Sequence, residues 1–151
     1  MASYRTVQSL VEHLIKRVYY ITLESIQPQL LEMYKASIRE NVYAVQRSGL
    51  YERTGTLLSS STANIKITNN MLTMDIFNDE NKMIWTYPSV SPKSPRDNRS
   101  NIVGYVEYGN KTGLFHYNAT NFFSKAKLDI ESNIVTMLKN ALTINGLRTV
   151  R

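Results

Sequence analysis

The first third of the chain repeats apolar residues at the spacing of an amphipathic helix. In residues 5–26 these side chains recur at steps of three and four, which places them on one helical face. The residues of this stripe are Val7, Leu10, Val11, Leu14, Ile15, Val18 and Ile21. The pattern therefore predicts a first helix within segment 1–27.

A proline then interrupts the pattern. Proline fits the first turn of a helix and disfavours helical geometry in the residue before it, so a second helix is predicted from Pro28 to about Ser48. Its apolar stripe consists of Leu31, Tyr34, Ile38, Val42 and Val45, and Gly49 follows as a C-terminal cap. The alternative is one long helix that is kinked at Pro28.

Beyond residue 56 the helical spacing gives way to alternation. Two runs alternate apolar and polar residues, which is the pattern of half-buried strands. Their apolar members are Ala63, Ile65 and Ile67 in the first run and Leu72, Met74 and Ile76 in the second. Asn69-Asn70 lies between the runs, and asparagine tolerates the positive φ of a tight turn. The sequence thus predicts a β-hairpin with one face in water.

The remaining segments complete the predicted fold. A long polar loop, 78–101, is inserted in the sheet, which is predicted over 56–109; its prolines exclude helix and central strand. Ile102–Tyr108 is predicted as a further strand, and a last helix over 120–142 precedes a tail, 143–151. The order predicts a single α+β domain, with N-terminal helices, an antiparallel sheet and a C-terminal helix packed on the sheet.

Composition adds limits to this outline. The 151 residues suit one domain. Cysteine is absent, which excludes a disulfide scaffold, a zinc–thiolate or iron–sulfur site and a cysteine nucleophile. The longest apolar run, Val18–Ile21, is far too short to span a membrane. We therefore expect a protein that is made in the cytoplasm and has no membrane partner.

Candidate catalytic chemistry is sparse. His13 and His116 have no second histidine at ligand spacing, so no metal site is predicted. Gly104, Gly109 and Gly113 lack the lysine and the strand–turn–helix setting of a phosphate loop. The sequence therefore predicts neither a cofactor nor an enzyme.

The net charge is +6, from 18 basic and 12 acidic residues, and it is spread along the chain. Dispersed positive charge favours solubility. Three basic residues, Lys93, Arg96 and Arg99, lie among the prolines of the long loop. Attraction of phosphate groups by these residues supports an alternative function, a basic nucleic-acid-binding accessory protein.

Two segments together resemble a known family. The first, 51–60, reads Tyr-Glu-Arg-Thr-Gly-Thr-Leu-Leu-Ser-Ser and lies between the helices and the hairpin. The second, 105–109, reads Tyr-Val-Glu-Tyr-Gly and precedes an aromatic-rich stretch and the last helix. Their order and spacing are similar to those of the small neck and tail-completion proteins of tailed bacteriophages, over residues 28–142. That family often has a proline before the phenylalanine of the last helix, where this chain has Asn121.

The resemblance implies a structural protein of the virion, at the head–tail connector or the tail terminus. It implies a ring, expected to hold six copies, through which genomic DNA passes, with portal-side or tail-tube proteins as neighbours. The motif residues are Arg53, Thr54, Gly55, Leu57, Glu107, Tyr108 and Gly109. The first helix, the loop with Lys93, Arg96 and Arg99, and the C-terminal tail are the expected contacts with neighbours.

The motif residues also have a physical interpretation of their own. Gly55 lies where the chain turns from helix to sheet, so it is expected to adopt a backbone geometry that a Cβ opposes. Leu57 is expected to pack between helices and sheet. On a strand, Glu107 faces opposite to Val106 and Tyr108, so with these two inward it is expected to point outward, toward Arg53 or a neighbouring subunit.

Overall fold

A helical segment runs without a break from Val7 to Tyr43 and is the longest element of the fold. The computed structural model of the chain describes residues 6–44, 55–69, 71–83, 107–108 and 119–147. In it, α1 (Val7–Ile21) continues through a π-helical turn, η1 (Thr22–Ile26), into α2 (Gln27–Ile38) and a second π-helical turn, η2 (Arg39–Tyr43). Thr6 caps the start, because its hydroxyl accepts a hydrogen bond from the Ser9 N–H at 3.1 Å.

The predicted second helix does not begin anew at Pro28, because the described helical segment continues through this residue, as in the alternative of one long helix. Pro28 has no N–H, so the turn before it cannot complete the usual α-helical hydrogen bonds between residues four apart. The turn widens instead, and the Gln27 N–H donates to the Thr22 carbonyl, five residues earlier. Leu30 is buried beyond this turn, whereas Leu31 of the predicted stripe is only half-buried.

The predicted hairpin is confirmed. β1 (Ser61–Thr68) pairs antiparallel with β2 (Met71–Asn78), and Ala63 lies opposite Ile76. Asn69 has a φ of 51°, the left-handed geometry that its side chain tolerates. β2 ends where the run of polar residues begins, and a short 3₁₀ turn, η3 (Glu80–Lys82), follows it. Across the described residues these are the two strands of the sheet.

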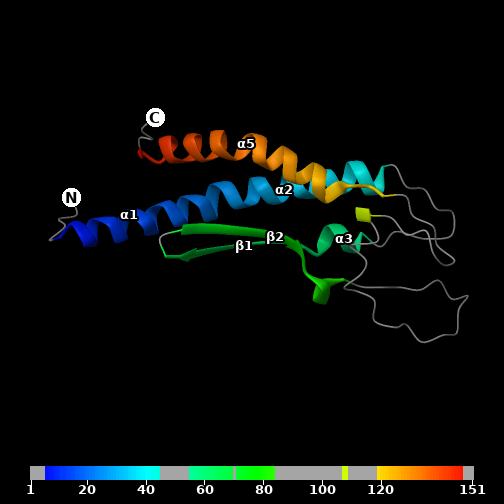
Figure 1. Cartoon of the computed structure of the whole chain (residues 1–151), viewed down its shortest axis with the longest axis horizontal. Helices are drawn as coiled ribbons and strands as arrows, with labels where there is room; N and C mark the ends of the chain where they lie inside the picture. The colour runs from blue at the N-terminus through cyan, green and yellow to red at the C-terminus, as the bar shows by residue number, and fades with distance from the viewer. Residues whose placement is uncertain (1–5, 45–54, 70, 84–106, 109–118, 148–151) are drawn as a thin grey trace, which may run out of the picture.

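The last helix, α5 (Phe122–Ile144), returns antiparallel along α2, close to its predicted bounds of 120–142. Figure 1 shows α5 on one side of the long helical segment and the hairpin on the other, with the start of α1 and the end of α5 toward the same end of the molecule. There the Arg17 guanidinium donates to the Asn145 carbonyl. The predicted α+β class, with a C-terminal helix packed on the sheet, is confirmed, because Met74 of β2 packs in one cluster with Ile130 and Ile134 of α5.

The buried apolar side chains form two clusters along the molecule. The distal cluster consists of Tyr34, Ile38, Val42, Leu57, Met83, Phe122 and Ala126. The proximal cluster consists of Ile21, Ile26, Leu30 and Ala141, with half-buried residues of α5 packed around it. Ile76 of β2 packs against both clusters, so the hairpin bridges the two halves of the core.

The prediction of a strand over Ile102–Tyr108 is wrong at the two residues that the structure describes. Glu107 and Tyr108 are helical rather than extended. The rest of that segment lies outside the described residues. Alternation of apolar and polar residues over a few positions fits a strand, but it also fits a short turn with a buried, hydrogen-bonded polar side chain. Glu107 is such a side chain.

Candidate functional site

The carboxylate of Glu107 lies at the start of α5 and accepts hydrogen bonds from its first turn. Oε2 accepts from the Phe123 N–H at 2.8 Å, and Oε1 accepts from the Ser124 N–H at 3.1 Å and the Ser124 hydroxyl at 2.8 Å. The first N–H groups of a helix have no partner within it, and the helix dipole is positive at this end. One carboxylate therefore satisfies two of these donors and stabilises the start of the helix.

The main chain of Glu107 adds a further contact. Its carbonyl accepts from the Asn121 N–H at 3.1 Å. Asn121 occupies the N-cap position of α5 in the left-handed region, with φ 51° and ψ 30°, and its own side chain makes no capping bond. Glu107 thus caps the helix in place of Asn121, although the two residues are 14 positions apart in the sequence.

The expectation that Glu107 points outward is therefore wrong. Its residue surface is only 3% exposed, whereas Tyr108 beside it is 76% exposed. The physical reason is that three hydrogen-bond donors compensate for burying the charge, whereas an ion pair at the surface contributes little. The motif residue is a structural link between its own segment and the last helix.

Tyr34 of α2 connects this cap to the hairpin. Its ring packs against those of Phe122 and Phe123, with centroids 5.9 and 6.2 Å away. Its hydroxyl donates to the Asn78 side-chain oxygen at 2.5 Å. Burial raises the pKa of the Tyr34 hydroxyl far above its usual range, and the charge of Glu107 adds to the effect. Tyr34 is therefore a neutral donor at any ordinary pH.

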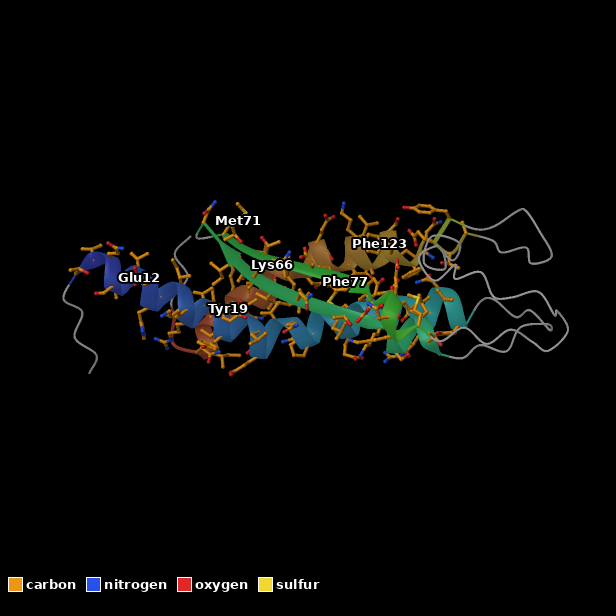
Figure 2. All side chains as sticks on the ribbon, turned by 90° about the horizontal axis from the view of Figure 1, so that it is seen from below. Glu12, Tyr19, Lys66, Met71, Phe77 and Phe123 are labelled. Carbon is orange, nitrogen blue, oxygen red and sulfur yellow. The ribbon has the colours of Figure 1, made fainter. Side chains whose placement is uncertain are left out.

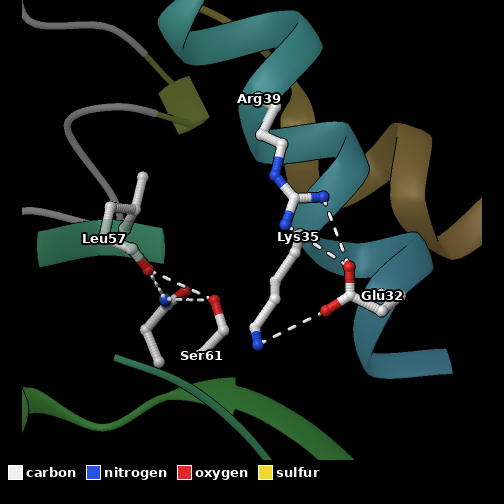
Figure 3. Close-up of polar contacts among 6 residues, drawn as sticks. Glu32, Lys35, Arg39, Leu57 and Ser61 are labelled. Carbon is white, nitrogen blue, oxygen red and sulfur yellow. Dashed lines mark hydrogen bonds and ion pairs between the residues drawn. The ribbon is translucent and has the colours of Figure 1, made fainter. Parts of the chain in front are cut away.

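The segment that begins at Gly55 packs against the same network. Gly55 has a φ of 71°, so it holds the left-handed geometry predicted for it, and α3 (Thr56–Ser59) follows. Leu57 is buried in the distal cluster, as predicted. Its carbonyl accepts from the Asn78 side-chain amide at 2.6 Å and from the Ser61 hydroxyl at 3.2 Å, as Figure 3 shows for Leu57 and Ser61.

Replacing Gly55 by valine is expected to lower the free energy of unfolding by about 2 kcal/mol, because a β-branched residue opposes positive φ. Apart from the chain neighbours of Gly55, no described atom lies within 4 Å of an added Cβ, so the described residues do not crowd it. Gly55→Asn is the matched control, since asparagine tolerates this geometry and is expected to cost less than half as much. Equal melting temperatures for wild type and Gly55→Val would contradict the turn argument.

Sequence reasoning missed the polar side chains that join these parts. Asn78 donates to Leu57 and accepts from Tyr34, yet in the sequence it stands out only as a strand breaker. Ser37 of α2 donates to the Phe122 carbonyl at 2.7 Å in a buried position. A serine or tyrosine inside an apolar helical stripe is the signal that marks such positions, because a buried polar group needs a partner.

Other predicted site residues lie outside the described residues. These are Arg53, Thr54 and Gly109 of the motif segments and Lys93, Arg96 and Arg99 of the long loop. The site that the structure describes is therefore the junction at which Leu57, two residues after Gly55, and Glu107 meet α2, β2 and α5. We call it the distal junction.

Apolar side chains of α1 are left without a partner among the described residues. Val7, Leu10, Val11 and Leu14, the first half of the predicted stripe, are exposed, and the stripe becomes buried only at Ile21. Figure 1 shows this part of α1 extending past the end of α5. Large apolar patches that are left exposed are often contact surfaces for other proteins.

The described surface is not basic. The described residues hold nine of the 18 basic and ten of the 12 acidic residues, a net charge of 9 − 10 = −1. Their ion pairs lie at the surface, such as Glu32 with Lys35 at 3.5 Å and with Arg39 at 3.3 Å (Figure 3). The excess positive charge, 9 − 2 = +7, therefore belongs to the segments outside the description.

Within the described part of the chain, no three histidine, aspartate or glutamate side chains gather as a metal site would require. None of the described helices combines the length and the apolar character needed to cross a membrane. No family model, no curated protein and no solved structure matches the chain.

Proposed function

We propose that the chain is a structural protein of a tailed-phage particle that joins the tail to the head as a ring around the DNA passage. The observation that carries the proposal is the distal junction. Leu57 of the first motif segment lies in one buried cluster with Phe122 of α5. Glu107 of the second motif segment caps the same helix, although Leu57 and Glu107 are 50 positions apart. The two motif segments therefore act as one folded unit, which supports treating their resemblance to neck and tail-completion proteins as a single match.

The exposed stripe of α1 supports assembly. A ring needs an interface between two different surfaces of neighbouring subunits, and that interface closes on itself. Val7, Leu10, Val11 and Leu14 offer one such surface at the proximal end of the molecule. The described motif residues Leu57 and Glu107 lie at the distal end, and we assign contacts with the head or the tail to that end.

The alternative function, a nucleic-acid-binding accessory protein, rests on the charge of the segments outside the description. Because the described residues have a net charge of −1, phosphate binding would fall to Lys93, Arg96 and Arg99 and other residues of those segments. Such binding weakens steeply as salt rises. A ring held by apolar contacts resists salt, so the salt dependence of any complex with DNA separates the two functions.

Deleting residues 89–100 tests the docking role of the long loop. A phage whose own copy of the gene is disrupted is expected to accumulate separate heads and tails, and the full chain supplied in trans is expected to restore joining. The deletion variant is expected to fold, with an unchanged melting temperature, and to restore joining at least tenfold less well, because in this proposal the loop makes the docking contact itself.

Electron microscopy of lysates and a count of infectious particles give the readout. A deletion variant that joins heads to tails as well as the full chain would remove the loop from the proposal. A gene disruption that leaves joined, infectious particles would overturn the proposed function.

A further inference from the structure

Among the described residues, the sheet has two strands, and one edge of β2 has no strand paired with it. A two-stranded sheet has limited stability alone, and an open edge is a template for another strand. Natural edges are often protected by proline, lysine or bulges. β2 (Met71–Asn78) contains no proline, glycine or lysine, and its one charge, Asp75, is paired with Lys66 of β1 at 2.9 Å.

The backbone groups that point out from this edge follow from the pairing. The Asp79 N–H donates to the Ser60 carbonyl at 2.8 Å, and bonded pairs alternate along an antiparallel ladder. With the observed register, Leu72, Met74 and Ile76 therefore direct N–H and C=O away from β1. On the opposite edge, the side chain of Gln27 donates to the outward carbonyl of Ala63. No described residue does the same for β2.

β2 is complementary to itself in one antiparallel register. With Met74 opposite Met74 of a second copy, Leu72 faces Ile76 and Thr73 faces Asp75. Leu72, Met74 and Ile76 of one copy then pair with Ile76, Met74 and Leu72 of the other. Each of these three pairs makes two backbone hydrogen bonds. Every pair joins apolar with apolar or polar with polar, and no like charges lie opposite each other.

The same register accounts for two exposed apolar side chains. Met71 is 65% exposed and Phe77 is 38% exposed, at the two ends of β2. Figure 2 shows both labelled residues along one strand of the hairpin. In the register centred on Met74, each Met71 lies opposite a Phe77 of the second copy, so pairing covers both.

We propose that the free protein is a two-fold dimer in which β2 pairs with β2 of a second copy and the two hairpins form one four-stranded sheet. The contact is isologous, as a two-fold axis requires. A head-to-tail ring contains no such axis between neighbours, so the dimer is a state of the free protein that must open before a ring closes. This inference concerns regulation of assembly and stands on the edge alone, without the proposed function.

Thr73→Asp tests the dimer without harming the hairpin. Thr73 lies opposite Lys66 within its own hairpin, so the new carboxylate is tolerated there. In the dimer it faces Asp75 of the second copy, twice by symmetry, and dimerisation is expected to weaken about tenfold. Thr68→Asp places the same charge on the same sheet face of β1 and is expected to leave the dimer unchanged.

Sedimentation equilibrium of the full chain and amide hydrogen exchange provide the measurements. A dimer is expected, with protection of the Leu72, Met74 and Ile76 amides that rises with protein concentration. A monomer at every concentration, protection independent of concentration, or an oligomer indifferent to Thr73→Asp would overturn the proposal. Head–tail joining by Thr73→Asp is expected to persist, which separates failure of the dimer from failure of the proposed function.

Discussion

Replacing Glu107 by alanine is expected to lower the free energy of unfolding by about 3 kcal/mol, because three donors in the first turn of α5 lose a charged acceptor. The Phe123 and Ser124 N–H groups and the Ser124 hydroxyl would be left without that partner. The favourable position of a negative charge at the helix N-terminus is lost as well. Urea unfolding of the full chain, followed by circular dichroism, gives the free energy.

Two variants control this experiment. Glu107→Gln keeps an oxygen acceptor in the same place, so it is expected to cost about half as much, through the lost charge. Glu131→Ala removes an acid from the exposed surface of α5, where the carboxylate is 3.8 Å from Lys127, and is expected to change stability by less than about 0.5 kcal/mol. If Glu107→Ala were no more destabilising than Glu131→Ala, the capping role would be wrong.

Replacing Phe122 by alanine is expected to cost about 3–5 kcal/mol, the range for truncating a fully buried phenylalanine. Phe122 has 0% exposure, and its ring contacts Tyr34 in the distal cluster. The cavity would open where α2 and α5 meet. A loss of this size is a large fraction of the stability of a small domain, so the variant is expected to be partly unfolded at 37 °C.

Phe123→Ala is the matched control for Phe122→Ala, since it removes the same side chain one position along. Phe123 is 44% exposed, and its ring lies edge-on to that of Tyr34 with the ring centroids 6.2 Å apart. Its loss is therefore expected to lower the free energy of unfolding by about 1 kcal/mol. Thermal unfolding of both variants measures the contrast. Equal losses would show that the distal cluster is not centred on Phe122.

The local features of the fold could be predicted because their causes are local. Alternation on both sides of Asn69 is enough to predict the hairpin and its buried face, and helical spacing predicts α5 to within two residues. The positive φ of Gly55 follows from its place between a helix and the sheet. In each case the residues that decide the structure are neighbours in the sequence.

The features that could not be predicted depend on distant partners. A proline in a helical pattern is compatible with both a break and a wide turn, and packing of η1 against α5 accompanies the wide turn at Pro28. The alternation around Glu107 does not indicate its partner Ser124, which is 17 positions away. The N–H and the hydroxyl of Ser124 donate to the buried carboxylate. The link from Tyr34 to Asn78 likewise spans 44 positions.

The position and copy number of the protein in the assembled particle test the central claim most directly. Electron cryo-microscopy of particles carrying a small tag on the chain, combined with quantitative mass spectrometry, supplies both. The account predicts one ring of six copies around the DNA passage, at the neck or tail terminus. Absence of the chain from joined particles, or its recovery bound along DNA in amounts that fall steeply with salt, would contradict it.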